Sequence, residues 1–456
     1  MTWSEVSPGV FSKELDGVEK IYRHISELFK PLGREHWGLY FVCDIELGAH
    51  LSSKDLTTAL RDAWKALRYE FPALSFRPDG LTKKTYVLPD ASSVEEWADE
   101  TFFVDRSTDP DGILASYPAR DTPSMHFFPE SSQVLFLCSH WRIDGIGTCI
   151  LMEHFFSLLT AATPSPVLKS RINDLHKISP SLEDALGAPT AETPEIQALA
   201  QKKIAEHHKN VVHAGGLPYR GDATTRPGCP TRTAITFNKA STATLIAACK
   251  ERKITVTSAV YAALATAVFS LSPDEAPEKY AAVMSVNMRS YLEPPYGSKD
   301  HAVQVYVTGR SPTVGRDSTF NQKTEHFMAY CKNWCDEEFI RSHRVATRHH
   351  YEAMFKRPEG TQPPKPPSSV TLSSLGVIEK NLPSQYGGGA VKLTDFRFGV
   401  SMMTRQIMLY VWTFGGRLTF SVNYNDAYHD VAAASGLMEF IRQTLKKEMG
   451  VTLQPE

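Results

Sequence analysis

Residues 139–147 read SHWRIDGIG, which places His140 four positions before Asp144 and a glycine directly after it. The preceding run 133–138, QVLFLC, is short, apolar and rich in β-branched and aromatic side chains, which predicts a buried strand. An apolar pattern with helical spacing follows over residues 149–159. A His at the end of a buried strand is held by the sheet and can still face a cleft, as a general base requires.

The composition is that of an average globular protein. The chain has 456 residues, of which 42% are hydrophobic and 22% charged, and its formal net charge is −2. This length predicts two domains of roughly 200 residues each, and the near-neutral charge gives no footprint for a nucleic-acid partner. No apolar run approaches the roughly 20 residues of a membrane span and no signal peptide is visible, so we expect no membrane partner. The seven Cys are dispersed, which favours free thiols in a reducing compartment and a cytoplasmic protein.

Helix and strand patterns alternate in the first third of the chain, which predicts an α/β domain with a mixed sheet. The expected elements are a helix over 17–29, a strand over 37–45, and a helix from Ser52 or Ser53 to about Glu70. Prolines punctuate the polar stretch from about 161 to 230, which predicts a crossover with one helix near 195–208. We therefore expect an N-terminal domain at 1–175, a linker at 176–230 and a C-terminal domain at 231–456.

The C-terminal half alternates in the same way. The expected elements are a strand at 233–237, a helix at 257–268 capped by Thr257, a strand at 281–289, a hairpin of 408–413 with 418–423, and a helix at 431–447. Residues 357–367 are rich in proline and predict an exposed loop. Asp395 and Gly399 are expected on a loop as well.

The motif resembles that of a known family. His140, Asp144 and Gly145 match the His-x-x-x-Asp-Gly pattern of the chloramphenicol acetyltransferase-like superfamily. This superfamily includes plant BAHD acyltransferases, condensation domains of nonribosomal peptide synthetases, and fungal acyltransferases such as trichothecene 15-O-acetyltransferase. Asn287-Met288-Arg289 stands where BAHD enzymes carry an Asn-x-Arg stretch, and residues 393–399, LTDFRFG, stand where they carry Asp-Phe-Gly-Trp-Gly.

Further residues place the chain within the superfamily. Residues 373–376, SSLG, and 410–413, YVWT, look most like the fungal branch. Arg397 and Phe398 replace the first Gly and the Trp of the plant motif, which places the chain outside the plant group. Ser139 stands where condensation domains carry the first of two His, which weakens a peptide-bond-forming interpretation.

The resemblance implies an α/β fold of two similar domains. Each is a mixed sheet flanked by helices, with a channel between them and His140 near its middle. It also implies acyl transfer from acyl-CoA, a co-substrate rather than a bound cofactor, to a small-molecule acceptor. We expect a monomeric O-acyltransferase acting on a hydroxyl, or an amine, of a specialised metabolite.

His140 is the predicted general base, because the reference pKa of imidazole, about 6.5, lies near cytosolic pH. Direct attack of the acceptor on the thioester is the simplest mechanism, and a covalent role for Cys138 stays open. Asp144 has two interpretations: it orients His140, or, as the resemblance implies, it forms an ion pair with Arg289. Gly145 and Gly147 allow close backbone approach or serve loop geometry alone.

The remaining candidates have weaker signals. The resemblance implies that Asp395 and Gly399 shape the channel or help the donor site, with a structural role favoured over a chemical one. Ser374 and Thr371 are candidate oxyanion donors or channel residues. No metal site is predicted, because the His and Glu residues near 153 and 350 lack the spacing that places two His on one helix face. Arginines surround His343, His349 and His350 in the sequence, which predicts a solvated basic face. Alternatively, this basic surface contacts the phosphates of coenzyme A.

Two alternative functions stay open at this point. In the first, the same fold takes its acyl group from a carrier protein, as in polyketide offloading or condensation. In the second, the fold binds a small ligand or catalyses a cyclisation without acyl transfer.

Overall fold

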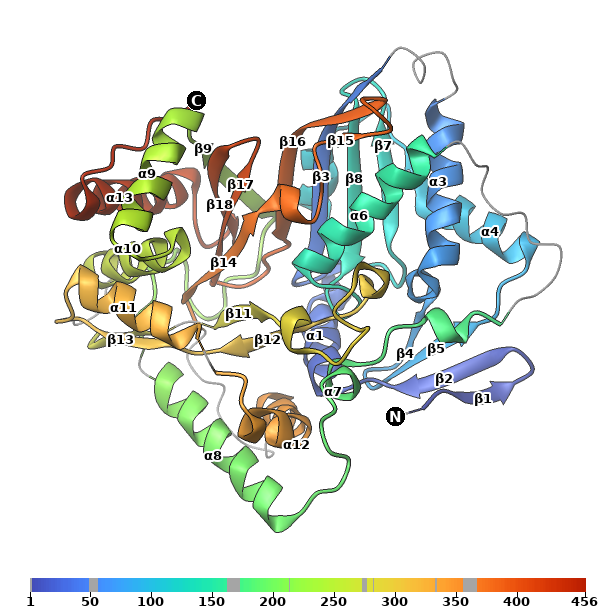
Figure 1. Cartoon of the computed structure of the whole chain (residues 1–456), viewed down its shortest axis with the longest axis horizontal. Helices are drawn as coiled ribbons and strands as arrows, with labels where there is room; N and C mark the ends of the chain where they lie inside the picture. The colour runs from blue at the N-terminus through green and yellow to red at the C-terminus, as the bar shows by residue number, and fades with distance from the viewer. Residues whose placement is uncertain are drawn as a thin grey trace. The chain divides into compact units, whose positions relative to one another are not determined.

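The computed structural model describes residues 2–48, 56–161, 173–212, 214–272, 277–281, 283–332, 334–355 and 367–456. Contacts divide the chain into two compact units, each assembled from three separate stretches (Figure 1). The first unit comprises Met1–Ala188, Asn287–Val307 and Ile378–Val400, and the second comprises Pro189–Val286, Thr308–Val377 and Ser401–Glu456. The stretches that contain Arg289 and Asp395 therefore belong to the same unit as His140. The boundaries at 175 and 230, as limits of separately folding domains, stay a prediction.

A six-stranded mixed sheet organises the first unit. Its order is β15 (Gln385–Tyr386), β16 (Val391–Val400), β3 (Gly38–Leu47), β8 (Gln133–Ser139), β7 (Ser124–Phe128) and β6 (Phe102–Val104). β6 and β7 run parallel, and the other neighbours run antiparallel. β3 and β8 both lie inside the sheet, and their apolar side chains are buried except for that of Leu47. The strands predicted at 37–45 and 133–138 are thus confirmed.

Helices of the first unit begin at well-formed caps. Asp16 caps α1 (Gly17–Glu27) in a capping box with Glu19, and Asp144 caps α6 (Gly145–Thr160). α3 (Leu56–Glu70) packs against α6 beside the large sheet (Figure 1). The shorter helices are α4 (Ala91–Thr101), α5 (Pro110–Ser116) and α7 (Leu182–Ala185). A second sheet has the order β1 (Ser4–Ser7), β2 (Val10–Glu14), β5 (Lys83–Val87) and β4 (Arg77–Asp79).

The second unit contains a four-stranded mixed sheet. Its order is β14 (Val370–Val377), β17 (Ile407–Phe414), β18 (Arg417–Asn425) and β9 (Pro230–Thr236). The tight turn between β17 and β18 has positive φ at Gly415 and Gly416, which confirms the predicted hairpin. α9 (Lys239–Glu251), α10 (Val256–Leu271) and α13 (Val431–Met449) contribute to its apolar core. Two short ladders pair β10 (Lys279–Ala281) with β13 (Thr313–Gly315) and β11 (Met284–Asn287) with β12 (Val307–Arg310).

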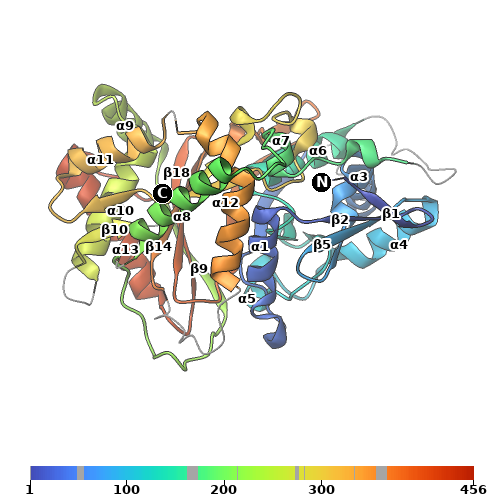
Figure 2. The same ribbon diagram turned by 90° about the horizontal axis from the view of Figure 1, so that it is seen from below.

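Three helices complete the second unit. α8 (Pro194–Val211), the helix predicted near 195–208, packs along α12 (Glu337–Phe355), as Figures 1 and 2 both show. α11 (Phe320–Tyr330) packs against α10. No helix within the described residues is both long and apolar enough to span a membrane by itself; α9 and α10 meet that test only as a pair bent by 96°.

Three expectations about local structure are wrong. Thr255, rather than Thr257, caps α10, because it forms a capping box with Ser258. The strand expected at 281–289 is split into β10 and β11, and Arg289 lies in a 3-10 turn. Asp395 and Gly399 lie on β16 rather than on a loop, because residues 391–400 pair with β3 despite a register shift between Leu393 and Asp395. The candidate caps Ser52 and Ser53, and all but the last residue of the proline-rich loop predicted at 357–367, lie outside the described residues.

Candidate active site

The predicted motif occupies the connection from β8 to α6. β8 ends at Ser139, and α6 begins after Asp144, whose carboxylate accepts a hydrogen bond from the Gly147 amide at 2.8 Å. The Thr148 hydroxyl donates to the Asp144 carbonyl at 2.9 Å. His140 is therefore held between the end of a central strand and the first turn of a buried helix.

The carboxylate of Asp144 is fully engaged. Arg289 Nη1 lies 2.9 Å from both of its oxygens, and the backbone amide of Tyr306 donates to Oδ2 at 2.8 Å. Asp144 and Arg289 are only 4% and 8% exposed, so the pair is buried. Asn287 Oδ1 accepts a further bond from Arg289 Nη1 at 3.2 Å. The predicted contact between Asp144 and Arg289 is present, and within the described part of the chain no hydrogen bond joins Asp144 to His140.

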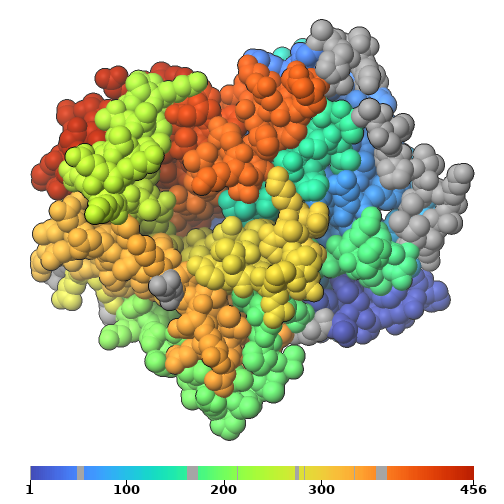
Figure 3. Space-filling model, in the orientation of Figure 1, coloured from blue at the N-terminus to red at the C-terminus, as the bar shows by residue number. Residues whose placement is uncertain are grey.

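Gly147 is required by this packing. A Cβ at this position would lie 2.4 Å from the Ala302 carbonyl oxygen and 2.7 Å from Arg289 Nη2. Residues Asn287–Val307 thus pack directly on the first turn of α6, and Figure 3 shows their surface (yellow) adjoining that of α6 (teal). Gly145 is the first residue of the helix. The expected close approach of backbone is confirmed at Gly147.

The ring of His140 stacks on Tyr22 of α1. Their centroids are 4.3 Å apart and their planes differ by 23°. His140 Nδ1 is buried and has no hydrogen-bond partner among the residues that the structure describes, while the side chain as a whole is half-buried. Burial lowers the pKa of His140, and the backbone groups of His140 and Ile143, together with the charge of Asp144, offset this only in part. The imidazole is therefore neutral near pH 7, as a proton acceptor must be.

Tyr22 was missed by sequence reasoning. It belongs to the helix predicted at 17–29, but its helical spacing indicates only an apolar face. Burial and the negative charge of Asp144 raise the pKa of its hydroxyl, so Tyr22 stays protonated. Its contact with His140 joins residues far apart in the chain, and no local pattern signals it.

Cys138 is poorly suited to nucleophilic attack. Its side chain is 3% exposed, and its thiol donates to the Ser139 carbonyl at 3.5 Å. Burial raises the pKa of the thiol to about 12, so the reactive thiolate is absent at neutral pH. This disfavours the covalent mechanism that the sequence left open.

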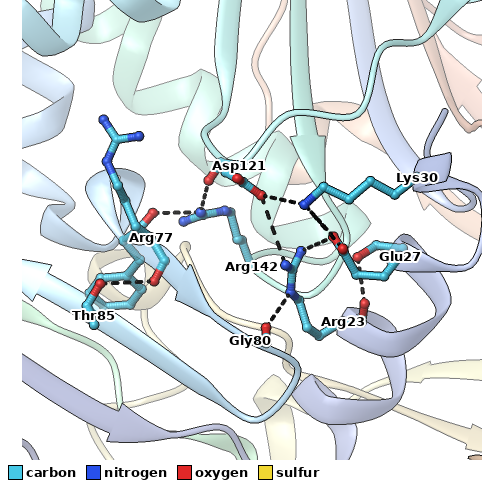
Figure 4. A network of polar contacts seen from close by, with 10 residues as sticks. Arg23, Glu27, Lys30, Arg77, Gly80, Thr85, Asp121 and Arg142 are labelled. Carbon is cyan, nitrogen blue, oxygen red and sulfur yellow. Dashed lines mark hydrogen bonds and ion pairs between the residues drawn. The ribbon is translucent and has the colours of Figure 1, made fainter. Parts of the chain in front are cut away.

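Arg142 ties the motif turn to a polar network (Figure 4). Its Nη2 donates to the Phe76 carbonyl at 2.6 Å and to the Asp121 carbonyl. The Asp121 carboxylate lies 4.0 Å from Arg23 Nη2 and 3.5 Å from Lys30 Nζ, both close to the C-terminal end of α1. Arg23 Nε also donates to the Gly80 carbonyl at 3.2 Å. The turn that carries His140 and the helix that carries Tyr22 thus share one network.

The register of the sheet separates Asp395 from His140. Asp395 pairs with Asp44 of β3, and Asp44 pairs with Gln133, the first residue of β8. His140 follows the last residue of β8, and at about 3.4 Å per residue the two ends lie roughly 20 Å apart. Gly399 pairs with Tyr40 at the end of the sheet nearer to His140. This placement favours a structural role for Asp395.

Ser374 and Thr371 lie on β14 of the second unit. Ser374 Oγ shares a hydrogen bond of 2.8 Å with Thr257 Oγ1 of α10, and Thr371 pairs with Met408 of β17. Their role as oxyanion donors stays a prediction.

The prediction of a solvated basic face on α12 is wrong for His343. His343 is buried, and burial lowers its pKa to about 4, so it is a neutral packing residue. Arg341 and Arg348 pair with Glu195 and Glu192 near the start of α8. No group of three or more His, Cys, Asp or Glu side chains among the described residues is arranged to hold a metal ion.

A separate cavity of about 380 Å³ lies further along α6. Its lining comprises Glu70, Phe71, His154, His176, Lys177, Asp300 and His301. His154 follows Asp144 by ten positions on α6, which corresponds to about 15 Å along a helix. This cavity therefore lies apart from the first turn of α6.

Known proteins resemble this chain over its whole length. O-acetyltransferase pigM of Monascus ruber is 46% identical over 100% of this chain and 89% of its own. Azaphilone biosynthesis cluster protein M of Aspergillus terreus is 37% identical over 98% of both chains, and acetyltransferase pigO of Monascus ruber is 30% identical over 99% of both. The family described as phthiocerol/phthiodiolone dimycocerosyl transferase C-terminus matches residues 226–333.

Solved structures show the same fold. The trichothecene 15-O-acetyltransferase TRI3 of Fusarium sporotrichioides superposes with a TM-score of 0.79 at 15% identity, over 97% of this chain and 96% of that one. The first condensation domain of the calcium-dependent antibiotic synthetase gives 0.63 at 13% identity, over 97% and 98%. The expected mixed α/β fold of the chloramphenicol acetyltransferase-like superfamily is confirmed. Within that superfamily, the chain belongs to the fungal O-acetyltransferase family that includes pigM and pigO.

Proposed function

We propose that this enzyme transfers the acetyl group of acetyl-CoA to a hydroxyl group of an azaphilone-type secondary metabolite, with His140 as the general base. The names of the relatives support the reaction and the class of acceptor, since pigM is an O-acetyltransferase and the Aspergillus terreus protein belongs to an azaphilone biosynthesis cluster. One observation carries the role of His140: a half-buried imidazole, kept neutral by burial, follows a central strand and stacks on Tyr22.

The enclosure of one ring nitrogen of His140 supports the other nitrogen as the proton acceptor. Nδ1 of His140 is buried, so Nε2 is the nitrogen that an acceptor can reach. Nε2 takes the proton of the acceptor hydroxyl as its oxygen attacks the thioester carbon. The tetrahedral intermediate then expels the thiolate of coenzyme A, which receives that proton from the imidazolium. The products are the acetyl ester and free coenzyme A thiol.

Asp144 and Arg289 support this chemistry from outside the reacting atoms. Their ion pair fixes the first turn of α6 and residues Asn287–Val307, and with them the turn that contains His140. Asp144 is also the charge that favours the imidazolium formed during the reaction. We assign both residues to positioning rather than to proton transfer.

We also propose an acyl donor, a cellular compartment and an oligomeric state for this enzyme. The acetyltransferase relatives favour acetyl-CoA as the co-substrate, and a carrier-bound acetyl group is the alternative donor. The dispersed Cys favour a cytoplasmic enzyme, and the resemblance to the acyltransferase family favours a monomer.

The test is acetyl transfer from acetyl-CoA to a hydroxylated azaphilone, followed by release of free thiol and by the mass of the product. We expect His140→Ala to lose about 10²- to 10⁴-fold in kcat, the range for loss of a general base. His208→Ala, an exposed His on α8, is the matched control and should keep the wild-type rate. A His140→Ala variant that retains the wild-type rate overturns the assignment of the base. Acetyl transfer from a carrier protein but not from acetyl-CoA overturns the assignment of the donor.

A further inference from the structure

Glu35 is a buried carboxyl group beside the strand end that precedes His140. Glu35 is 4% exposed, and Ser139, the last residue of β8, is 5% exposed. The antiparallel ladder pairs Gly38 with Ser139, so the segment that precedes β3 runs alongside the start of the motif. Trp37 has a φ of 60°, which turns the chain between Glu35 and β3.

A small cavity joins the carboxyl group of Glu35 to the end of β8. Its volume is about 10 Å³, and it is lined by Glu35, Tyr117, Pro118, Arg120, Thr122, Leu137, Cys138 and Ser139. This is close to the least volume that holds one water molecule. Ser139 Oγ is buried and has no hydrogen-bond partner among the described residues, and its nearness as a donor acts to lower the pKa of Glu35.

Tyr117 closes the other side of this cavity. Its ring fills the space where Gly38 has no side chain: a Cβ there would lie 2.1 Å from the Tyr117 ring. The Tyr117 hydroxyl donates to the Leu39 carbonyl at 2.8 Å and lies 3.3 Å from the Cys138 carbonyl. The surroundings of Glu35 therefore include the end of β8, which leads into the motif, and Tyr117, which packs on the start of β3.

Charged and titratable groups face Glu35 from every neighbouring element. They are Arg23 and Glu27 on α1, Arg142 on the motif turn, Cys138 on β8, and Tyr117 and Arg120 on the segment after α5. Burial raises the pKa of Glu35 to about 7. Ser139, Arg23 and Arg142 act in the opposite direction and lower this pKa. Figure 4 shows these two arginines in one network with Asp121.

We propose that Glu35 is a positioning residue for acetyl transfer, because its carboxyl group, bridged by one water molecule to the Ser139 hydroxyl across the shared cavity, fixes the strand end that carries His140. This inference rests on the proposed role of His140. The uncharged carboxyl group suits a small cavity in which Glu35 and Ser139 are buried, whereas the ionised group draws water or the neighbouring arginines toward itself. Ionisation of Glu35 therefore moves Ser139 and with it the base.

The test compares kcat between pH 5 and 9 in matched variants. We expect wild-type kcat to fall above about pH 7, and Glu35→Gln, which has the same shape without the charge, to lose this alkaline decline. Glu35→Leu should lower kcat by roughly 10- to 100-fold with an unchanged KM for acetyl-CoA, as expected when a catalytic group is misplaced. Ser139→Ala should move the alkaline midpoint upward, because its hydroxyl favours the ionised carboxylate. Glu130→Gln, at an exposed carboxylate, is the control and should match the wild type.

The outcomes separate this inference from the proposed function. If His140→Ala is inactive while Glu35→Gln keeps the wild-type alkaline decline and Glu35→Leu keeps the wild-type kcat, the role of Glu35 is overturned and the base assignment stands. If His140→Ala is active, the proposed function itself fails. Should Glu35→Leu not fold, Glu35→Gln and Ser139→Ala decide the question: an unchanged pH profile in both overturns the proposal.

Discussion

Arg289 Nη1 lies 2.9 Å from both carboxylate oxygens of Asp144, although the two residues are separated by 145 positions in the chain. The pair joins the start of α6 to a stretch that the chain reaches only after the first stretch of the second unit, Pro189–Val286, has been traced. Because both residues are buried, their interaction stabilises the unit that carries His140 and is costly to break from one side alone.

The first prediction concerns this ion pair. Asp144→Ala leaves Arg289 buried without its partner and removes the N-cap of α6, so the free energy of unfolding should fall by about 3–5 kcal/mol. Denaturant unfolding measures the change. Asp430→Ala is the control, because Asp430 caps α13 but has only an exposed ion pair, and should cost about 1 kcal/mol. Equal losses in the two variants contradict the importance of the buried pair.

The second prediction concerns Gly147. The added Cβ of Gly147→Ala meets the backbone carbonyl of Ala302, which cannot move without displacing its stretch, so we expect a loss of about 1–3 kcal/mol in unfolding free energy. Gly436→Ala on α13 is the matched helical variant. Its Cβ meets no atom within 4 Å, and it should stabilise the protein by roughly 0.5–1 kcal/mol. In thermal unfolding, Gly147→Ala should lower the melting temperature and Gly436→Ala should raise it. A change of the same sign in both variants contradicts the close packing of Gly147 on Ala302.

The third prediction concerns the stacking of Tyr22 on His140. Tyr22→Phe keeps an aromatic ring at this position and should retain kcat within a few fold. Tyr22→Leu removes a stacked contact of the kind worth about 0.5–1.5 kcal/mol, so kcat should fall by up to roughly tenfold while KM for acetyl-CoA stays the same. Steady-state kinetics at pH 7 measures both. A Tyr22→Phe variant as impaired as Tyr22→Leu indicates that the hydroxyl, rather than the ring, is the important group.

The fourth prediction concerns stability and pH. Burial raises the pKa of Glu35 to about 7, so the folded protein holds a proton that the unfolded chain has already lost above about pH 4.5. The contribution of Glu35 to stability therefore falls as pH rises through this window, by roughly 1.4 kcal/mol per pH unit, and levels off above pH 7. Glu35→Gln should lack this dependence. Parallel stability curves for wild type and Glu35→Gln between pH 4.5 and 7 contradict a buried, protonated Glu35.

The local parts of the site were predictable from sequence, and the non-local parts were not. His140, Asp144 and Gly147 lie within one short motif, where an apolar strand, a capping Asp and a close-packed Gly leave a clear pattern. The contact with Arg289 was expected only through resemblance to a family. Tyr22 and Glu35 reach the motif through the packing of α1 and the register of β3 with β8, which no single stretch of sequence specifies.

The errors in the predicted elements have similar causes. The register shift in β16 interrupts its alternation near Asp395, so the segment has the pattern of a loop although its neighbours pair with β3. The strand expected at 281–289 is interrupted, because β10 pairs with β13 whereas β11 pairs with β12. These pairings are non-local and leave no pattern in the segment itself. Thr255 and Thr257 are equally good caps by residue type, and the capping box with Ser258 selects the first.

Whether His140 is the general base is decided by the pH dependence of kcat/KM for wild type and His140→Ala. A general base must be unprotonated, and burial lowers the pKa of His140 below its usual value of 6.5. The rate should therefore rise through an acid limb whose midpoint lies below pH 6.5, and this limb should be absent from the residual activity of His140→Ala. A midpoint above 6.5, or the same acid limb in His140→Ala, would contradict the assignment of His140 as the base.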